Sequence, residues 1–100
     1  MTPNTWRGAA GLALEQLRAH LSAARTQIAD RDLALRPVQR WADWLLYSVR
    51  QGLIDVQALR SNLWEHLTHA EREEVDRATA ALTEYKAHAV EAGAHILPGA

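Results

Sequence analysis

The fold depends on the stretch RPVQRWADWLLYSVRQGLIDVQALRSNLWEHL, residues Arg36–Leu67. It holds three of the chain's four tryptophans and a proline suited to the first turn of a helix, where the missing N–H costs nothing. From Pro37 onward, the apolar residues cover roughly 140° of a helical wheel. The sequence therefore predicts a well-buried helix over residues 37–50, with this apolar face: Val38, Trp41, Ala42, Leu45, Leu46 and Val49.

A second short helix is expected over residues 55–67, separated from the first by a turn at Gly52. Glycine accepts the positive φ that the position after a helix end requires. Asp55 can cap the next helix, and Ile54 with Leu59 has the spacing of a hydrophobic staple. The buried face of that helix would be formed by Val56, Leu59, Leu63 and Leu67.

Two long helices are expected on either side of this stretch, over residues 5–30 and 69–92. The first has an apolar seam with the 4-3-4-3-4 spacing of a coiled coil: Ala10, Leu14, Leu17, Leu21, Ala24 and Ile28. The last has a similar seam: Val75, Ala78, Leu82, Tyr85 and Ala89. Thr68 and Glu71 match a capping box and mark where the last helix begins.

These elements predict an all-α, bundle-like fold of four helices, two long and two short. A chain of 100 residues makes one domain, here residues 1–92, and residues 93–100 are expected to form a tail. The small residues on the two long seams permit close helix approach. These seams are expected to pair within the chain or, alternatively, to form a homodimer through the first and last helices.

Composition narrows the range of functions. Eleven basic residues against twelve acidic ones give a net charge of −1, which does not favour nucleic-acid binding. With no cysteine, the chain has no disulfide, thiolate nucleophile or cysteine-bound zinc. Ten of the eleven basic residues are arginine, which indicates a GC-rich bacterial genome. No long apolar run or signal peptide is evident, so a cytoplasmic protein without membrane spans is expected.

Aromatic side chains outside the apolar arc indicate a partner-binding surface. Trp44 and Tyr47 project away from the buried face of the 37–50 helix, near Arg40, and Trp64 lies off-centre on the next helix. Tryptophan, tyrosine and arginine are the residues that dominate binding energy at protein interfaces. The alternative is that another helix of the same domain covers them.

Histidines provide the candidate metal ligands. His66 and His69 are three residues apart, one turn of a continuous helix, and His88 would be needed as a third ligand. The simpler interpretation of His66 is a hydrogen-bonded histidine at the edge of the core. No serine lies in a nucleophile motif, so we predict no catalytic residue on this chain.

A helix-turn-helix is a further alternative, with helices over residues 38–50 and 56–67 around Gly52. The second helix would offer side chains able to read bases: Gln57, Arg60, Ser61 and Asn62. The segment between the helices is longer than the usual turn, and the near-neutral charge does not support DNA binding.

The segment Trp41–Trp64 resembles the N-terminal helical part of nitrile hydratase β subunits and of the accessory proteins related to them. The matching residues are Trp44, Leu45, Leu46, Gly52, Leu53, Ile54, Leu59 and Trp64. Upstream, residues 12–21 (LALEQLRAHL) are similar to a helix of that family that carries an arginine, and Leu97–Ala100 resembles its linker to a β-barrel.

This resemblance implies a helical subunit or activator-like partner that packs on a metal-bearing subunit of a nitrile hydratase-type enzyme. It also implies that iron or cobalt is held by that partner, and that Arg18 contacts the partner's metal ligands from outside the first shell. Two other functions stay open: a stand-alone helical adaptor or inhibitor that occludes a partner surface, and a small DNA-binding regulator.

Overall fold

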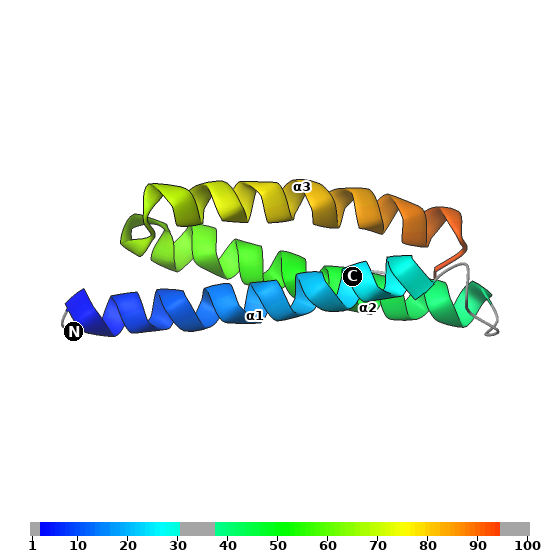
Figure 1. The fold of residues 1–100 in the computed structure, drawn as a ribbon, viewed down its shortest axis with the longest axis horizontal. Coiled ribbons are helices and arrows are strands. Elements are labelled where there is room, and N and C mark those ends of the chain that lie inside the picture. The colour runs from blue at the N-terminus through cyan, green and yellow to red at the C-terminus, as the bar shows by residue number, and fades with distance from the viewer. Residues whose placement is uncertain (1–2, 31–37, 95–100) are drawn as a thin grey trace.

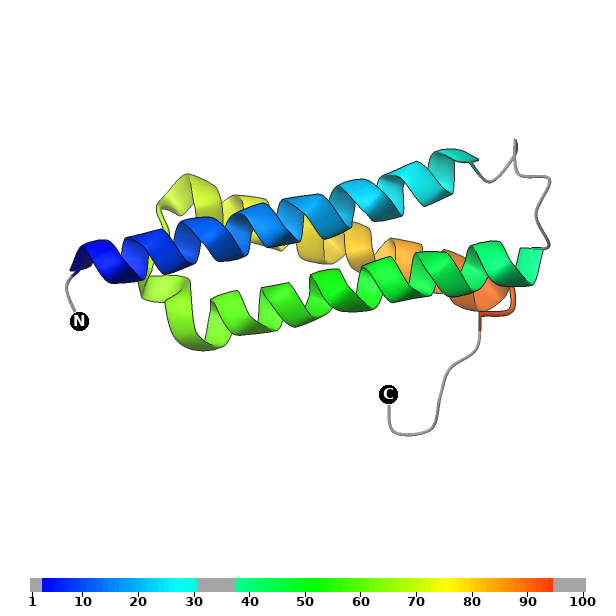
Figure 2. The same cartoon turned by 90° about the horizontal axis from the view of Figure 1, so that it is seen from below.

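The computed structural model describes residues 3–30 and 38–94. Within these ranges the chain forms three α-helices packed together: α1 (Pro3–Ala29), α2 (Val38–Ala58) and α3 (His69–Glu91). The helices run side by side, and each is antiparallel to the next one along the chain. In Figure 1, α2 lies between α3 and α1 and farther from the viewer. In the view turned by 90°, α1 and α2 lie side by side with α3 behind them (Figure 2). The fold is therefore all-α, as predicted, but with three helices and not four.

The two long helices form as the sequence predicts. The seam of α1 is buried from Ala10 to Ala24, and α3 buries Val75, Ala78, Leu82 and Ala89. Thr68 caps α3: its hydroxyl accepts a hydrogen bond from the Glu71 backbone N–H (3.1 Å), and the Glu71 carboxylate accepts one from the Thr68 N–H (2.8 Å). This capping box is the predicted one. Most of both seams is buried by the chain's own helices, as expected for pairing within the chain.

The end of α3 is also where the sequence places it. Gly93 has φ 94°, a left-handed conformation that side chains disfavour. Its N–H donates to the Val90 carbonyl (3.0 Å), and the Ala94 N–H donates to the Ala89 carbonyl (3.0 Å). This pattern is a Schellman motif, in which the two residues after the helix satisfy its last free carbonyls.

Gly52 does not end a helix, and the predicted division of residues 37–67 into two helices is wrong. α2 continues from Val38 to Ala58 through Gly52. Gly52 is buried against α3, and a Cβ atom placed on it would lie 2.9 Å from Leu82 Cδ1. Glycine is needed here for the close approach of two helices, and its conformational freedom is not used.

Asp55 and Ile54 therefore have other roles than those predicted. Both lie inside α2, so Asp55 caps no helix and Ile54 forms no staple. The Asp55 carboxylate Oδ2 lies 2.5 Å from His20 Nδ1 and joins α2 to α1. The Ile54 side chain is 57% exposed.

α2 ends in a corner of two irregular turns. Leu59–Leu63 (η2) forms a π turn and Trp64–His66 (η3) a 3₁₀ turn. Leu67 and Thr68 are then extended, with ψ angles of 144° and 166°. Leu59, Leu63 and Leu67 remain buried through this change of geometry. The chain reverses direction here, and α3 begins.

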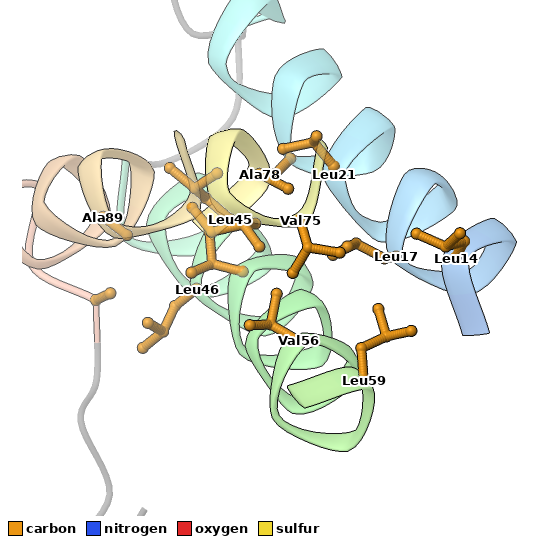
Figure 3. Packing of buried hydrophobic residues seen from close by; sticks show 14 of the residues in the cluster. Leu14, Leu17, Leu21, Leu45, Leu46, Val56, Leu59, Val75, Ala78 and Ala89 are labelled. Carbon is orange, nitrogen blue, oxygen red and sulfur yellow. The ribbon is translucent and has the colours of Figure 1, made fainter. Parts of the chain in front are cut away.

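A single core lies along the axis between the three helices (Figure 3). The largest fully buried side chains come from α1, α2 with its π turn, and α3: Leu14, Leu17, Leu45, Val49, Leu59, Val75 and Leu82. The Trp41 indole, 5% exposed, also donates a hydrogen bond to the Gln27 backbone carbonyl of α1. Buried residues of all three helices belong to this one cluster.

Two predictions lie partly outside the described residues. Pro37, expected in the first turn of the second helix, is one; the tail from His95 onward is the other. Among the described helices, none combines the length and the hydropathy that a membrane span requires.

Candidate partner-binding surface on helix α2

A second line of residues follows α2 on the side away from the core. We call it the outer stripe: Arg40, Trp44, Tyr47, Gln51, Ile54 and Ala58. Their 4-3-4-3-4 spacing is the a/d spacing of a coiled-coil helix. Gln51 is half-buried and the other five are exposed. The stripe contains three of the five large exposed hydrophobic side chains of the described residues, since Trp44 is 50% exposed and Tyr47 and Ile54 are each 57% exposed.

Trp44 and Tyr47 form the aromatic centre of the outer stripe. Their ring centroids are 6.3 Å apart and their planes meet at 85°, an edge-to-face pair. Such a pair is favourable beyond the area it buries and restrains both rings. The sequence left open whether another helix covers these side chains; in the structure both are at least half exposed. This is the composition and the preorganisation of an interface anchor.

The two edges of the outer stripe differ. On one edge Trp41, Ser48 and Asp55 are turned toward the chain's own core and α1, and the first two are buried. The other edge carries Asp43 and Arg50, both half-buried, followed by the exposed Gln57. A partner lying on the stripe would therefore meet one edge that the chain itself covers and one charged edge that is partly accessible.

Trp64, also predicted to bind a partner, is not part of the outer stripe. It lies in the 3₁₀ turn at the corner, partly buried against the core. The guanidinium carbons of Arg60 and Arg72 lie 4.9 and 5.6 Å from its ring centroid. Arg72 Nε also donates to the Trp64 carbonyl (3.0 Å). These cation–π and hydrogen-bond contacts give Trp64 a structural role in holding the corner.

The first turns of α1 close the same corner. Arg7 donates to the His66 carbonyl (2.7 Å) and to both Glu71 carboxylate oxygens (2.8 and 3.3 Å). The rings of Trp6 and His66 stack with centroids 5.2 Å apart. The hydrogen bond from Arg7, assisted by the backbone N–H of Thr68, lowers the pKa of Glu71 from 4.5 to about 2. The hydrogen bond to Glu71 also raises the pKa of Arg7.

Arg18, the candidate contact to a partner's metal ligands, is engaged within the chain. Its Nε and Nη2 donate to the two Glu74 carboxylate oxygens at 2.6 and 2.8 Å, which joins α1 to α3. This pair lowers the pKa of Glu74 and raises that of Arg18. Because α2 packs against both α1 and α3, the Arg18–Glu74 pair and the outer stripe lie on opposite sides of the bundle. A single partner would have to reach around α1 or α3 to contact both.

The histidines are not brought together. His66 and His69 are separated by the extended residues Leu67 and Thr68, so the predicted spacing of one helical turn is wrong. His66 stacks on Trp6, and His69 Nε2 lies 3.0 Å from Glu73. His88 is about 28 Å farther along α3 than His69, at 1.5 Å per residue. Within residues 3–30 and 38–94, no three histidine or carboxylate side chains are placed to hold one metal ion.

The turn of the predicted helix-turn-helix is also missing, because Gly52 lies inside α2. Of the proposed base-reading residues, Gln57 is in α2 and the other three are in the π turn. Arg60 pairs with Asp76 of α3 at 2.6 Å. These residues do not form an independent recognition helix.

An open hollow of about 360 Å³ lies at the opposite end of the bundle from the corner. Its lining residues are Ile28, Trp41, His88, Glu91 and Ala92. The two ionisable side chains among these described residues, His88 and Glu91, are exposed, so neither is a desolvated polar group that would select a ligand. The outer stripe is the stronger candidate.

The sequence predicts the first half of the outer stripe, with Arg40, Trp44 and Tyr47, but not the second half. The turn expected at Gly52 places Gln51 and Ile54 in a turn and Ala58 in a different helix, so these residues do not align with Trp44 and Tyr47 in the predicted fold. A single helical wheel drawn from Val38 to Ala58 shows this alignment.

Comparisons of the chain with protein-family models, with curated proteins and with solved structures gave no match.

Proposed function

We propose that this chain acts by docking on another protein through the outer stripe of α2, and not by catalysis. One observation carries the proposal: a coiled-coil spacing of six residues on the outward side of a helix whose inward side is already buried. The stripe supplies rigid aromatic side chains and an accessible charged edge, the features of an interface anchor.

The alternative explanation, scattered exposed hydrophobic residues, accounts poorly for this pattern. Single exposed leucines or valines are normal on a soluble protein. Leu12 and Val90 are examples on α1 and α3. Trp44, Tyr47 and Ile54 instead lie in register on one helix, and three large side chains in a line form a contact surface.

A narrower form of the proposal names the partner. The resemblance of Trp41–Trp64 to nitrile hydratase β subunits and their accessory proteins favours a metal-bearing subunit, with its iron or cobalt held outside this chain. In that case the partner would also have to reach around α1 or α3 to Arg18, which would exchange its contact with Glu74 for the partner's metal ligands. The stand-alone adaptor or inhibitor differs only in the identity of the partner.

Photo-crosslinking in the native host tests the docking proposal. A photoreactive amino acid at position 47 should give a defined adduct, whereas the same group at Ala80, exposed on α3, should not. The adduct partner, identified by mass spectrometry and purified, should bind the chain, and Trp44→Ala should weaken binding at least tenfold, as for an interface anchor. Equal crosslinking at positions 47 and 80, or an affinity that is unchanged by Trp44→Ala, would refute docking through the outer stripe.

The same crosslinked adduct also tests the proposed identity of the partner. Iron or cobalt in the purified partner would support a nitrile hydratase-type subunit. A partner without bound metal would contradict that identity and leave the adaptor.

A further inference from the structure

The first four residues of the outer stripe, Arg40, Trp44, Tyr47 and Gln51, are complementary to the same four residues of a second copy when the two helices run in opposite directions. A two-fold axis that brings residue i against residue j also brings j against i. With the axis between Trp44 and Tyr47, each tryptophan faces the tyrosine of the other copy. In the next layer, Arg40 of each copy faces Gln51 of the other.

The charged edge is complementary under the same axis. Asp43 and Arg50 lie on this edge, seven residues and two helical turns apart. The axis between Trp44 and Tyr47 brings Asp43 of each copy next to Arg50 of the other, so the ion pair forms twice. A carboxylate accepts several hydrogen bonds, so Asp43 can make this contact while keeping its contacts within its own chain.

Charge selects this arrangement over the others that the stripe allows. Moving the axis to between Tyr47 and Gln51 places Arg50 against Arg50. A parallel pair places Arg40 against Arg40 and turns the charged edge toward Trp41 and Ser48, which the chain buries itself. One exposed ion pair changes an equilibrium constant by up to about fivefold, so two pairs can fix the register while the aromatic rings supply the affinity.

The area available indicates a weak dimer. An aromatic side chain that is half exposed offers roughly 100 Å², so Trp44 and Tyr47 together offer about 200 Å² per copy. A stable interface of standard size buries about 800 Å² per partner. A single helix pair falls short of this, and we expect a dissociation constant on the order of 100 µM.

We infer that a second copy of this chain occupies the outer stripe, antiparallel, about a two-fold axis between Trp44 and Tyr47. The inference rests on the proposed function, because it names an occupant of the same surface. Any other partner that uses the stripe must then displace the second copy.

Sedimentation equilibrium over about 5–500 µM measures the association. The average mass of the intact chain should rise from one copy toward two, and Tyr47→Ala should weaken association at least tenfold. Leu12→Ala, which truncates an equally exposed side chain on α1, should leave it unchanged. A chain that stays monomeric at 500 µM, or one that associates equally well with Tyr47→Ala, would overturn the inference.

A charge exchange tests the register. Arg50→Asp should weaken the dimer by about fivefold or more, because it places Asp43 next to another aspartate. The double variant Asp43→Arg/Arg50→Asp restores opposite charges across the axis and should recover the original affinity. If the double variant is as weak as the single one while circular dichroism shows both folded, the proposed register is wrong.

Cysteine crosslinking tests the helix direction, since the chain has no cysteine of its own. A mixture of Arg40→Cys and Gln51→Cys chains should form the mixed disulfide. A disulfide between two Arg40→Cys chains would indicate a parallel pair. A disulfide between Arg40→Cys and Ala58→Cys chains would indicate the shifted axis. Ala80→Cys on α3 measures the background from random collisions. If the disulfide of the parallel pair or that of the shifted axis is the main product, the inference is overturned.

Failure of this inference and failure of the proposed function give different results. A monomeric chain whose position 47 still crosslinks to another protein in the host contradicts the second copy and leaves docking intact. A monomeric chain without specific crosslinks at position 47 contradicts both.

Discussion

The two faces of α2 have the same kind of spacing and opposite environments. On the inner face Leu45, Val49 and Gly52 are buried by α1 and α3. On the outer face Trp44, Tyr47 and Ile54 repeat at intervals of three and seven residues, and each side chain is at least half exposed. A three-helix bundle can cover only one side of each helix. The outer face of α2 is therefore the face on which we propose that another molecule docks.

Substitutions on the two faces should therefore separate residues that stabilise the fold from residues that bind a partner. Removal of an inner side chain should reduce the stability of the monomer. Removal of an outer side chain should reduce association and leave the monomer intact. Measurements of unfolding should be made at about 5 µM, well below the expected dissociation constant, so that the two effects do not mix.

The largest effect is expected for Leu45→Ala. Leu45 is fully buried at the centre of the core, and a leucine-to-alanine change in such a site lowers the free energy of unfolding by about 2–5 kcal/mol. Urea denaturation followed by circular dichroism measures it. Tyr47→Ala, two residues along the same helix, is the matched control. A loss below about 1 kcal/mol for Leu45→Ala would mean that this core is not closely packed.

The sequence predicted the class of fold and most of the core because apolar periodicity is a local property. The seams of α1 and α3, the Thr68 capping box and the helix end at Gly93 were each encoded within a few residues. The error at Gly52 had a non-local cause. Whether a glycine ends a helix or admits a neighbouring helix depends on Leu82, thirty residues away, and nothing near Gly52 encodes that contact.

The second prediction concerns this contact. Gly52→Ala improves helix propensity by about 1 kcal/mol but places a Cβ 2.9 Å from a fully buried Leu82 methyl group, and overpacking costs about 1–3 kcal/mol. We expect a net loss of about 1 kcal/mol. In the Leu82→Ala background the added methyl meets a cavity, so the same change should become stabilising. A double-mutant cycle in urea measures this, and additive effects would contradict the close approach.

A third prediction concerns acid. The pKa of Glu71 is lowered to about 2, so its stabilising contribution is complete above about pH 4.5 and is lost as the pH falls toward 2. The lowered pKa of Glu74 acts in the same direction. We expect Glu71→Gln to lower the free energy of unfolding at pH 7 by about 1 kcal/mol, the scale of a capping interaction. It should also reduce the slope of stability against pH between 4.5 and 3. A slope equal to that of the unchanged chain would show that the corner does not depend on this carboxylate.

The candidate surface was only partly predictable for the same reason as the fold. Trp44 and Tyr47 were recognisable because aromatic residues off the apolar arc are unusual. Ile54 was not recognisable as part of the surface, because a turn at Gly52 makes it the first residue of a hydrophobic staple. The sequence places Trp64 with the binding surface because its contacts with Arg60 and Arg72 are not local. These two arginines reach the Trp64 ring only where the end of α2 and the start of α3 meet at the corner.

The smallest change in monomer stability is expected for the outer stripe. Tyr47→Ala removes a side chain that is 57% exposed and packs edge-to-face on Trp44, so the free energy of unfolding at 5 µM should change by no more than about 0.5 kcal/mol. Ile54→Ser should behave alike. A loss near 2 kcal/mol for either variant would place these residues with the inner face as part of the fold. Because each stripe residue would then be needed for folding, its exposure would no longer be evidence of a binding surface.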